Sequence, residues 1–294
     1  MGPGVDGNQG LAASLWRRPR LQLSLLLAGP VGWLVIAYLG SLAVLFLAAF
    51  WQLDTFSGKV VHSYGIQNFE TLIREGVYRS IVLRTVLIAA AVTVTDALLA
   101  FPIAFYMAKV ARRRARALLV ILIVMPLWSS YLVKVYSWRI ILAEDGILNW
   151  ALAPFGLHGP GFGNVATWLV FSYLWLPYMI LPCYAALERI PNSLLDASSD
   201  LGGGAWMTLR RVVLPLGLPG VVAGSIFTFS LTLGDYITPV LVGGAGSTFI
   251  GNVVYSNVGI ANNVPFAAAL ATVPVAIMAV YLLIARRLGA FEAL

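Results

Sequence analysis

The sequence predicts an all-helical integral membrane protein with six transmembrane helices, and three observations lead to this fold class. Hydrophobic residues make up 60% of the 294 residues, charged residues make up only 11%, and the mean hydropathy is +0.87. Soluble domains have about 45–50% apolar and about 25% charged residues, so the bilayer must be the solvent for most of this chain. Long apolar stretches recur along the chain, and basic residues gather in every second segment between them.

Each predicted span is an apolar stretch of about 20 residues or more. The six spans are predicted at roughly 21–51, 80–108, 118–142, 165–187, 216–242 and 263–285. The first is long enough to include an interfacial helix or a tilt, and it is too long for the apolar core of a cleaved signal peptide. Residues 1–20 are predicted to be a disordered cytoplasmic segment, and residues 21–294 a single transmembrane domain.

The basic residues predict the topology. Of the 19 Lys and Arg residues, thirteen fall in the segments assigned to the cytoplasm: Arg17, Arg18, Arg20, Lys109, Arg112, Arg113, Arg114, Arg116, Arg189, Arg210, Arg211, Arg286 and Arg287. The outer loops contain only Lys59, Arg74 and Arg79. Because short cytoplasmic loops are enriched in Lys and Arg, both termini are predicted to be cytoplasmic. The net charge of +7 therefore serves orientation in the membrane, and nucleic acid is not expected as a partner.

The two long outer loops predict one short helix and one irregular segment, and the cysteine and histidine residues argue against a disulfide and a metal site. The outer loop 52–79 is predicted to carry a short amphipathic helix near Asn68–Glu75, and the loop 143–164 is predicted to be irregular because it is rich in Gly and Pro. The single cysteine, Cys183, excludes a disulfide within the chain. The two histidines lie far apart and have no metal-ligand spacing, so no metal site is predicted.

The stretch between spans four and five predicts a short helix on the cytoplasmic face. Pro191 ends the preceding span, and Ser193 with Asp196 three residues later resembles a capping box with Asp in place of Glu. Leu194, Leu195 and Leu201 give this helix an apolar side. Gly202 is expected to take the left-handed conformation that ends it.

A second helix is predicted from about Ala205 to Val213, and Pro215 and Pro219 are expected to break the chain at the entry to span five. The residues alone leave two readings open. The helix–turn–helix is either an interfacial amphipathic linker or a docking element for another protein.

This stretch resembles the cytoplasmic signature of binding-protein-dependent ABC importer permeases. The signature is Glu-Ala-Ala, three residues, Gly, nine residues and then Ile-x-Leu-Pro. Asp196-Ala197-Ser198, Gly202, Val212 and Leu214-Pro215 stand at the matching positions. Asp for Glu, Ser for the second Ala and Val for Ile are departures, but the spacing is kept throughout.

The resemblance implies a type I ABC importer permease with a coupling helix between spans four and five. In that family the helix docks on a cytosolic ATPase, whose closure moves the spans between inward- and outward-open states. The implied coupling residues are Asp196, Ala197, Ser198, Gly202, Leu214 and Pro215. The chain has no phosphate-binding loop, because Gly58-Lys59 lacks the upstream Gly and the following hydroxyl residue. It is therefore expected to be no enzyme and to hold no cofactor, with ATP and magnesium bound by two separate ATPase subunits.

Two further stretches resemble the spermidine/putrescine-type branch of these permeases. One runs from Met125 to Trp138 with Gly146–Asn149 after it, and the other runs from Leu233 to Gly244 with Ile250–Asn252 after it. The resemblance implies a polyamine-like cation as cargo, a second homologous but non-identical permease, an extracytoplasmic binding protein and the inner membrane of a bacterium. The alternatives are the same machine with an opine, an amino-acid derivative or an organophosphonate, a secondary transporter or channel, and a membrane enzyme.

The expected substrate pathway combines aromatic side chains and carboxylates. Trp128, Tyr131, Val135 and Trp138 recur at helical spacing and should share one face of span three. Such a face either holds ammonium groups by cation–π attraction or serves packing.

Two acidic residues fall within the spans, where an ionisable group is costly and faces a cavity or a partner. Asp235, with Tyr236 beside it, either attracts a cationic substrate or pairs with Lys134 or Arg139. Asp96 in span two has the same two readings. Gly220-x-x-x-Gly224 in span five predicts a close helix-packing face.

Overall fold

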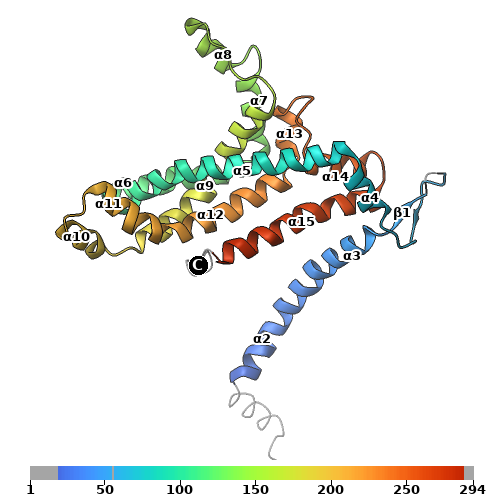
Figure 1. Cartoon of the computed structure of the whole chain (residues 1–294), viewed down its shortest axis with the longest axis horizontal. Coiled ribbons are helices and arrows are strands. Elements are labelled where there is room, and N and C mark those ends of the chain that lie inside the picture. Colours follow the sequence, from blue (N-terminus) through green and yellow to red (C-terminus); the bar gives the residue numbers. More distant parts are fainter. Residues whose placement is uncertain (1–18, 55, 288–294) are drawn as a thin grey trace, which may run out of the picture.

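The computed structural model describes residues 19–54 and 56–287, and nearly all of its regular structure is helical (Figure 1). In chain order the helices and strands are α2 (Pro19–Leu34), α3 (Gly40–Ala48), β1 (Gln52–Leu53), β2 (Val60–Val61), α4 (Gln67–Arg74), α5 (Gly76–Phe105), α6 (Arg113–Trp128), α7 (Tyr131–Leu142), α8 (Ile147–Leu152), α9 (Asn164–Glu188), α10 (Asn192–Asp200), α11 (Ala205–Thr208), α12 (Leu214–Gly234), α13 (Ile237–Val242), α14 (Ile250–Gly259) and α15 (Val264–Arg287). π-helical turns cover Val35–Leu39, Tyr106–Val110 and Leu209–Val213, and a 3-10 turn covers Ala153–Phe155. Disorder was predicted for residues 1–20, of which residues 1–18 lie outside the described residues, whereas Pro19 and Arg20 belong to α2.

Five helices among the described residues are long and apolar enough to cross a membrane: Leu26–Ala48, Gly76–Val110, Asn164–Glu188, Ala205–Gly234 and Val264–Arg287. The stretch predicted as span three is not one helix. It consists of α6 and α7, which meet at a bend of 93°, and the count is six only if this pair is a single span. Span five also ends earlier than predicted, because α12 ends at Gly234 and the chain is irregular before α13.

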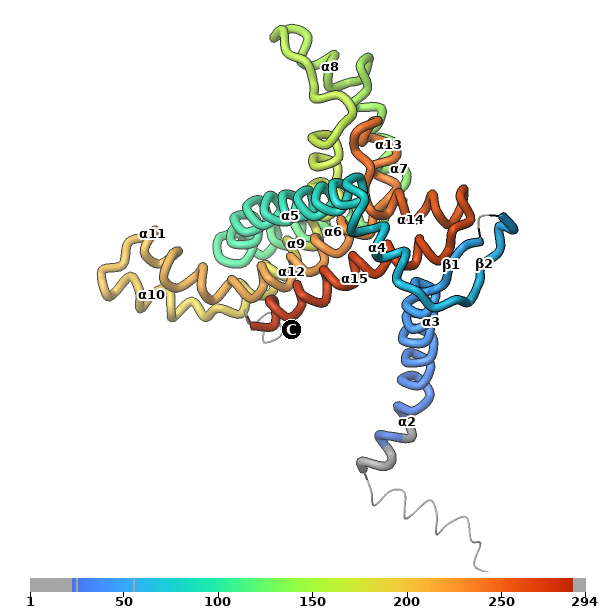
Figure 2. Tube along the Cα trace, turned by 45° about the vertical axis from the view of Figure 1, so that its right-hand side comes forward, coloured from blue at the N-terminus to red at the C-terminus, as the bar shows by residue number. Residues whose placement is uncertain are grey.

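The core of the bundle is formed by α5, α9 and α12, which lie side by side with α15 along α12 (Figures 1 and 2). One cluster of buried side chains joins Phe171 and Leu174 of α9 to Val135 of α7 and Phe249. A second cluster, at the end of the bundle that carries α10 and α11, joins α5, α9 and Val213. We call that end of the bundle the α10 end, and the opposite end, which carries β1 and β2, the hairpin end.

A stripe of glycines lets α12 approach α9 closely. A Cβ atom added at Gly220 would lie 2.4 Å from the Cβ of Ala186 and 2.7 Å from the carbonyl oxygen of Pro182. One turn on, a Cβ at Gly224 would lie 2.8 Å from the sulfur of Met179. The packing face predicted from Gly220 and Gly224 is therefore confirmed, and it extends back to Gly217, which faces Leu187.

Gly220→Ala is expected to destabilise the protein by about 1–3 kcal/mol, because the added methyl group overpacks the contact between α12 and α9. A lower midpoint of thermal unfolding of the purified chain in detergent would measure this loss. Gly32→Ala is the matched control, since a Cβ at Gly32 of α2 meets no atom within 4 Å. Equal midpoints for the two variants would contradict a packing role for the stripe.

The N-terminal helices α2 and α3 diverge from the bundle (Figure 2). Contact with the body is confined to the end of α3, where Ala48 and Ala49 pack against Ala268 and Ala269 of α15. Most of the described apolar side chains along the rest of α2 and α3 are exposed, whereas Leu42 and Leu45 are half-buried. This arrangement leaves most of the first predicted span without neighbours among the described residues of the single chain.

The hairpin end contains short elements that hold the loops. β1 and β2 pair antiparallel, with Gln52 opposite Val61, and this pairing was not predicted. The predicted amphipathic helix in this loop is confirmed as α4, and the side-chain amide of Asn68 fixes it to the carbonyls of Ala49 and Trp51 at 2.9 and 2.8 Å. The loop 143–164 is less irregular than predicted, because it contains α8.

Candidate functional site

We call residues 191–215, which are predicted to contact an ATPase, the coupling segment. It begins with a short helix closed by a glycine turn. α10 begins after Pro191, which is its N-cap, and no side chain caps it. The prediction of Ser193 as N-cap, with Asp196 completing a capping box, is therefore wrong. The physical reason is that the helical backbone already begins at Asn192, so Ser193 lies inside the first turn.

The C-terminal end of α10 has the predicted geometry. Gly202 adopts a φ of +79°, the left-handed region. Its amide donates to the carbonyl of Ser199 at 2.9 Å, and the amide of Gly203 donates to the carbonyl of Ser198 at 2.8 Å. These two bonds form a Schellman motif, which satisfies the last carbonyls of the helix. A Cβ at Gly203 would lie 2.6 Å from the carbonyl oxygen of Ser198, so both glycines are required.

The turn holds α10 rigidly against the start of span five. The hydroxyl groups of Ser198 and Thr208 are hydrogen-bonded at 2.8 Å and join α10 to α11. Leu195 packs into the buried cluster at the α10 end together with Leu209. α10 is therefore joined to the bundle by direct packing and by a hydrogen bond.

The predicted break at Pro215 and Pro219 does not occur. Helical structure continues from Ala205 to Gly234 through the π-helical turn Leu209–Val213. Proline lacks an amide hydrogen and its ring crowds the preceding turn, and a π-turn placed before Pro215 accommodates both effects. α11 and span five thus form one continuous helix, and α10 is joined to it through the glycine turn.

The predicted coupling residues differ in where they lie. Asp196 and Ala197 are exposed on α10, and Leu214 and Pro215 are exposed on α12. Leu201, predicted to belong to the apolar side of the helix, is 89% exposed, and Trp206, which was not predicted, is 72% exposed. Trp206 follows the glycine turn and, with Leu201, offers an apolar surface at the extreme α10 end.

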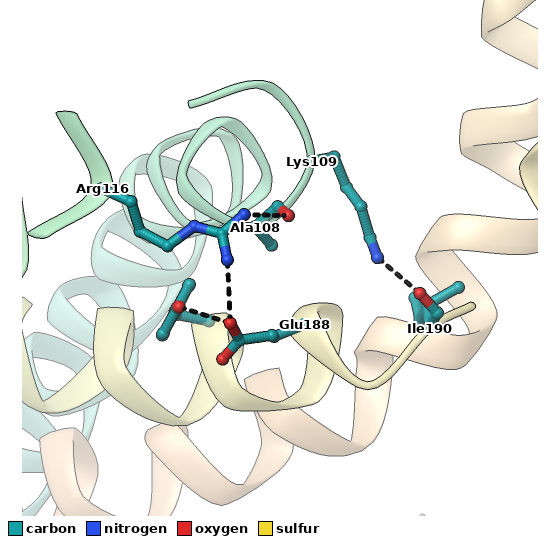
Figure 3. Close-up of polar contacts among 6 residues, drawn as sticks. Ala108, Lys109, Arg116, Glu188 and Ile190 are labelled. Atoms are coloured by element: carbon teal, nitrogen blue, oxygen red, sulfur yellow. Dashed lines mark hydrogen bonds and ion pairs between the residues drawn. The ribbon is translucent and has the colours of Figure 1, made fainter. Parts of the chain in front are cut away.

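A set of polar contacts, the clamp, fixes the helix ends beneath the coupling segment (Figure 3). A guanidinium nitrogen of Arg116 lies 3.1 Å from a carboxylate oxygen of Glu188, and another donates to the carbonyl of Ala108 at 3.2 Å. Tyr184 donates to the same carboxylate at 2.8 Å. The ammonium group of Lys109 donates to the carbonyl of Ile190, directly before α10. The clamp ties α5, α6 and α9 together where α10 emerges.

The bend between α6 and α7 rearranges the predicted aromatic face. Tyr131, Val135 and Trp138 all belong to α7 and pack on the first buried cluster, as their spacing predicted. Trp128 ends α6 and is 88% exposed, so the prediction that it shares their face is wrong. The backbone turns between them, and helical spacing does not persist across a 93° bend.

The carbonyl oxygen of Pro126 accepts two side-chain hydrogen bonds at this bend. Ser129 donates to it from its hydroxyl group at 2.9 Å, and the ammonium group of Lys134 donates to it at 3.1 Å. The ammonium group of Lys134 is thus hydrogen-bonded to a backbone carbonyl. The described residues contain no ion pair between Asp235 and either Lys134 or Arg139, so this alternative for Asp235 is not realised.

The carboxylate of Asp235 lies between α12 and α13, at the second break in the spans. One of its oxygens accepts hydrogen bonds from the amides of Ile237 and Thr238 at 2.8 and 3.1 Å, which starts α13. The other accepts hydrogen bonds from the hydroxyl groups of Thr238 and Tyr131. All four donors are neutral, so the described part of the chain leaves the negative charge without a cationic partner.

Asp235 borders an open cavity of about 400 Å³. The lining residues are Tyr131, Trp175, Ser230, Leu231, Gly234, Asp235, Tyr236 and Ile237. Trp175 stacks on Tyr131 with ring centroids 6.1 Å apart and an interplanar angle of 10°. We call this cavity the Asp235 pocket. It combines an unbalanced carboxylate with aromatic faces, which is the chemistry that holds an organic cation.

Sequence reasoning missed Trp175, which lines the pocket. It also missed Thr238, which does not line the pocket but donates to the carboxylate of Asp235. Thr238 follows Asp235 at the spacing at which Asp starts a helix, and this signal was available in the sequence. Trp175 lies within a uniformly apolar span, where its sequence context resembles ordinary packing. Trp138, by contrast, packs against Tyr173 with ring centroids 5.4 Å apart and does not line the pocket.

Asn252 supports the break beside the pocket. Its side-chain amide donates to the carbonyl of Tyr236 at 2.7 Å, and its side-chain oxygen accepts the amide of Phe249 at 2.9 Å. The backbone carbonyl released from the helix is therefore satisfied inside the protein, as membrane depth requires.

Asp96 is separate from the pocket. Its side chain is fully buried in α5, and neither oxygen has a hydrogen-bond partner among the described residues. The hydroxyl group of Ser172 on α9 is its polar neighbour and is likewise without a hydrogen bond. Within the described residues no group of His, Cys, Asp and Glu has the arrangement of a metal site.

Comparison with known sequences identifies similar proteins over the whole length. The family described as "Binding-protein-dependent transport system inner membrane component" matches residues 94–290. The chain is 46% identical to the inner membrane ABC transporter permease protein YdcU of Escherichia coli (strain K12), over 99% of this chain and 97% of that protein. It is 34% identical to the spermidine/putrescine transport system permease protein PotB of Haemophilus influenzae, over 70% and 72%.

Solved structures share the architecture at lower identity. A chain of a bacterial alginate ABC transporter, in complex with an alginate pentasaccharide-bound periplasmic protein, aligns with a TM-score of 0.76 at 15% identity, over 96% of this chain and 97% of that one. A chain of the inward-facing MetNI methionine ABC transporter aligns with a TM-score of 0.52 at 18% identity, over 75% and 99%. At these identities the likeness concerns the fold alone.

Proposed function

The chain belongs to the family of binding-protein-dependent transport system inner membrane components and is a permease subunit of an ABC importer, and we propose that its cargo is a polyamine-like organic cation. The observation that carries the cargo proposal is the Asp235 pocket, where a carboxylate with no cationic partner among the described residues lies beside Tyr131 and Trp175. A cation entering this pocket gains both charge pairing and cation–π contacts. The likeness to PotB, whose name states spermidine and putrescine transport, points in the same direction.

We further propose that the chain works with two ATPase subunits, one of which binds the α10 end. Their energy is needed because this chain is a permease without an ATPase of its own. The exposed Asp196 and Ala197 on α10, with Leu201 and Trp206 beyond the turn, supply a polar and apolar surface for this contact. On this reading the α10 end and both chain termini face the bacterial cytoplasm, as the basic residues predict.

The remaining partners in this proposal are a second permease and an extracytoplasmic binding protein. The second permease, similar but not identical, would cover the exposed α2 and α3 and complete the open side of the Asp235 pocket. The binding protein would deliver cargo at the hairpin end. An opine, an amino-acid derivative or an organophosphonate is the competing cargo, and a cationic nitrogen is what the pocket favours among them.

Uptake by the reconstituted importer tests this proposal. The permease is co-expressed with its ATPase, second permease and binding protein, and the complex is placed in liposomes. We expect labelled spermidine to accumulate only when ATP and the binding protein are both present. Unlabelled putrescine should compete for uptake, whereas an organophosphonate should not.

The other outcomes separate the rival functions. ATP hydrolysis without spermidine uptake would retain the importer and discard the polyamine cargo. Uptake driven by an ion gradient in the absence of ATP would contradict the coupling role of α10 and favour a secondary transporter.

A further inference from the structure

The contact between Tyr131 and Asp235 joins two breaks in the membrane spans. Tyr131 is the first residue of α7, directly after the bend that follows α6. Asp235 is the residue at which α12 stops, before α13 begins. Each break gives the chain a point at which a rigid helix can pivot. The phenol–carboxylate hydrogen bond is a cross-link between these two pivots.

The contact also occupies the part of the carboxylate that faces the pocket. One oxygen of Asp235 is committed to the amides that start α13. The phenol of Tyr131 donates to the other oxygen and is itself hydrogen-bonded to the hydroxyl of Thr238 at 2.8 Å. Both residues line the same cavity, so an arriving ligand meets the phenol and the carboxylate together.

We propose that Tyr131 is a cargo-displaced latch: its phenol holds α7 to α13 through Asp235, and an ammonium group of the cargo takes its place on the carboxylate. This inference rests on the proposed function and deepens it, since it names the residue that links cargo binding to opening. A charged donor forms a stronger hydrogen bond to a carboxylate than a neutral phenol does, by roughly a factor of two in energy. A neutral solute lacks this advantage and leaves the latch closed.

The displacement requires no other cation to leave the pocket. Lys134, the nearest basic residue along α7, donates to the carbonyl of Pro126 on the other side of the bend. Once released, the ring of Tyr131 remains beside Trp175 and can contribute to holding the ammonium group. The carboxylate of Asp235 therefore exchanges the phenol for the ammonium group, while the rings of Tyr131 and Trp175 continue to line the pocket.

The test compares Tyr131→Phe with Tyr136→Phe in the assembled importer. Phenylalanine keeps the ring of Tyr131 and removes the hydroxyl group that competes for Asp235. Tyr136 lies on the same helix with an exposed side chain, and it does not line the pocket, so it controls for loss of a hydroxyl from α7. Two readouts are taken: ATP hydrolysis without any cargo, and equilibrium binding of labelled spermidine to the complex without its binding protein.

The latch predicts gains from Tyr131→Phe. Spermidine should bind about tenfold more tightly, because the competing hydrogen bond to a charged acceptor is gone. Cargo-free ATP hydrolysis should rise severalfold, because α7 and α13 separate without cargo. Tyr136→Phe should change neither readout. In an Asp235→Asn background Tyr131→Phe should no longer tighten binding, since the contested carboxylate is absent.

Weaker spermidine binding in Tyr131→Phe with unchanged hydrolysis would overturn the latch, because that result describes a residue that only shapes the pocket. Faster cargo-free hydrolysis in Tyr131→Phe, in an importer whose wild-type form binds no spermidine, would support the latch between the breaks and overturn its release by a polyamine. A wild-type complex that binds spermidine but responds to neither variant would retain the proposed function and overturn the latch.

Discussion

Asp235→Asn is expected to weaken spermidine binding by about tenfold to a hundredfold and to reduce uptake in proportion. The substitution removes the only charge among the described residues that line the pocket, while keeping the size of the side chain. A hydrogen bond that involves a charged group contributes about 1.5–3 kcal/mol, which corresponds to this range of affinity. The measurement is a spermidine saturation curve for the reconstituted importer, with ATP hydrolysis recorded in parallel to confirm that the subunits are assembled.

Asp96→Asn is the matched control for Asp235→Asn. It is the same chemical change in a neighbouring span, at a buried carboxylate that does not line the pocket. We expect it to leave spermidine saturation unchanged. A loss confined to Asp96→Asn would move the cation site from the Asp235 pocket to the middle of α5, where Asp96 was also a predicted pathway residue.

Gly202→Val is expected to reduce ATP-driven uptake by about tenfold by unfolding the turn that closes α10. At a φ of +79° a side chain with a Cβ atom costs about 1–2 kcal/mol, and a branched one costs more. Such a cost shifts the population of the ordered turn by about fivefold to thirtyfold. Uptake of spermidine and co-purification of the ATPase with the permease measure the effect.

Gly202→Asn separates the turn from the mere presence of a side chain. Asn tolerates the left-handed conformation because its short polar side chain bonds locally, so the Schellman motif should persist. We expect Gly202→Asn to retain most of the uptake that Gly202→Val loses. Equal losses in both variants would indicate that the ATPase requires direct contact with the glycine itself rather than a particular conformation.

Hydropathy and residue spacing predicted most of the helices because the bilayer imposes a simple rule on them. The apolar stretches over α5, α9 and α15 are continuous helices, and α4 lies where its amphipathic pattern indicated. The break between α6 and α7 was missed because averaging over a window treats Ser129 and Ser130 as a small dip in hydropathy. Whether the backbone bends there depends on tertiary partners such as Lys134, which satisfy the released carbonyl.

At the start of span five the error was the opposite one: proline predicted a break where the helix is continuous. Pro215 predicts a helix break in isolation, yet the helix continues because the π-turn before it removes the steric conflict. The sequence also placed the start of α10 two residues late, since the preference of Ser193 for N-caps is weaker than the constraint that Pro191 puts on the backbone. Local residue preferences therefore predicted where the coupling segment lies, but not where α10 begins or whether the helix breaks before span five.

Only some of the pocket residues were predicted, because a local pattern does not contain long-range packing. Asp235 was a candidate because an ionisable group is unusual inside a span, and Tyr236 because it lies beside Asp235. Tyr131, Trp128 and Trp138 were candidates because of their helical spacing, and of these three only Tyr131 lines the pocket. Trp175 comes to the pocket through the packing of α9 against α7, a long-range contact that a periodic pattern in one segment does not contain.

The bend after α6 also has a consequence for the surrounding lipid. α6 has 16 residues and is about 24 Å long, shorter than the roughly 30 Å of hydrocarbon in a typical bilayer. The chain therefore turns aside while still at the depth of the acyl chains, where exposed irregular backbone is not tolerated. The annulus of lipid must be interrupted there, and phospholipids with longer acyl chains will fit this flank of the protein less well than shorter ones.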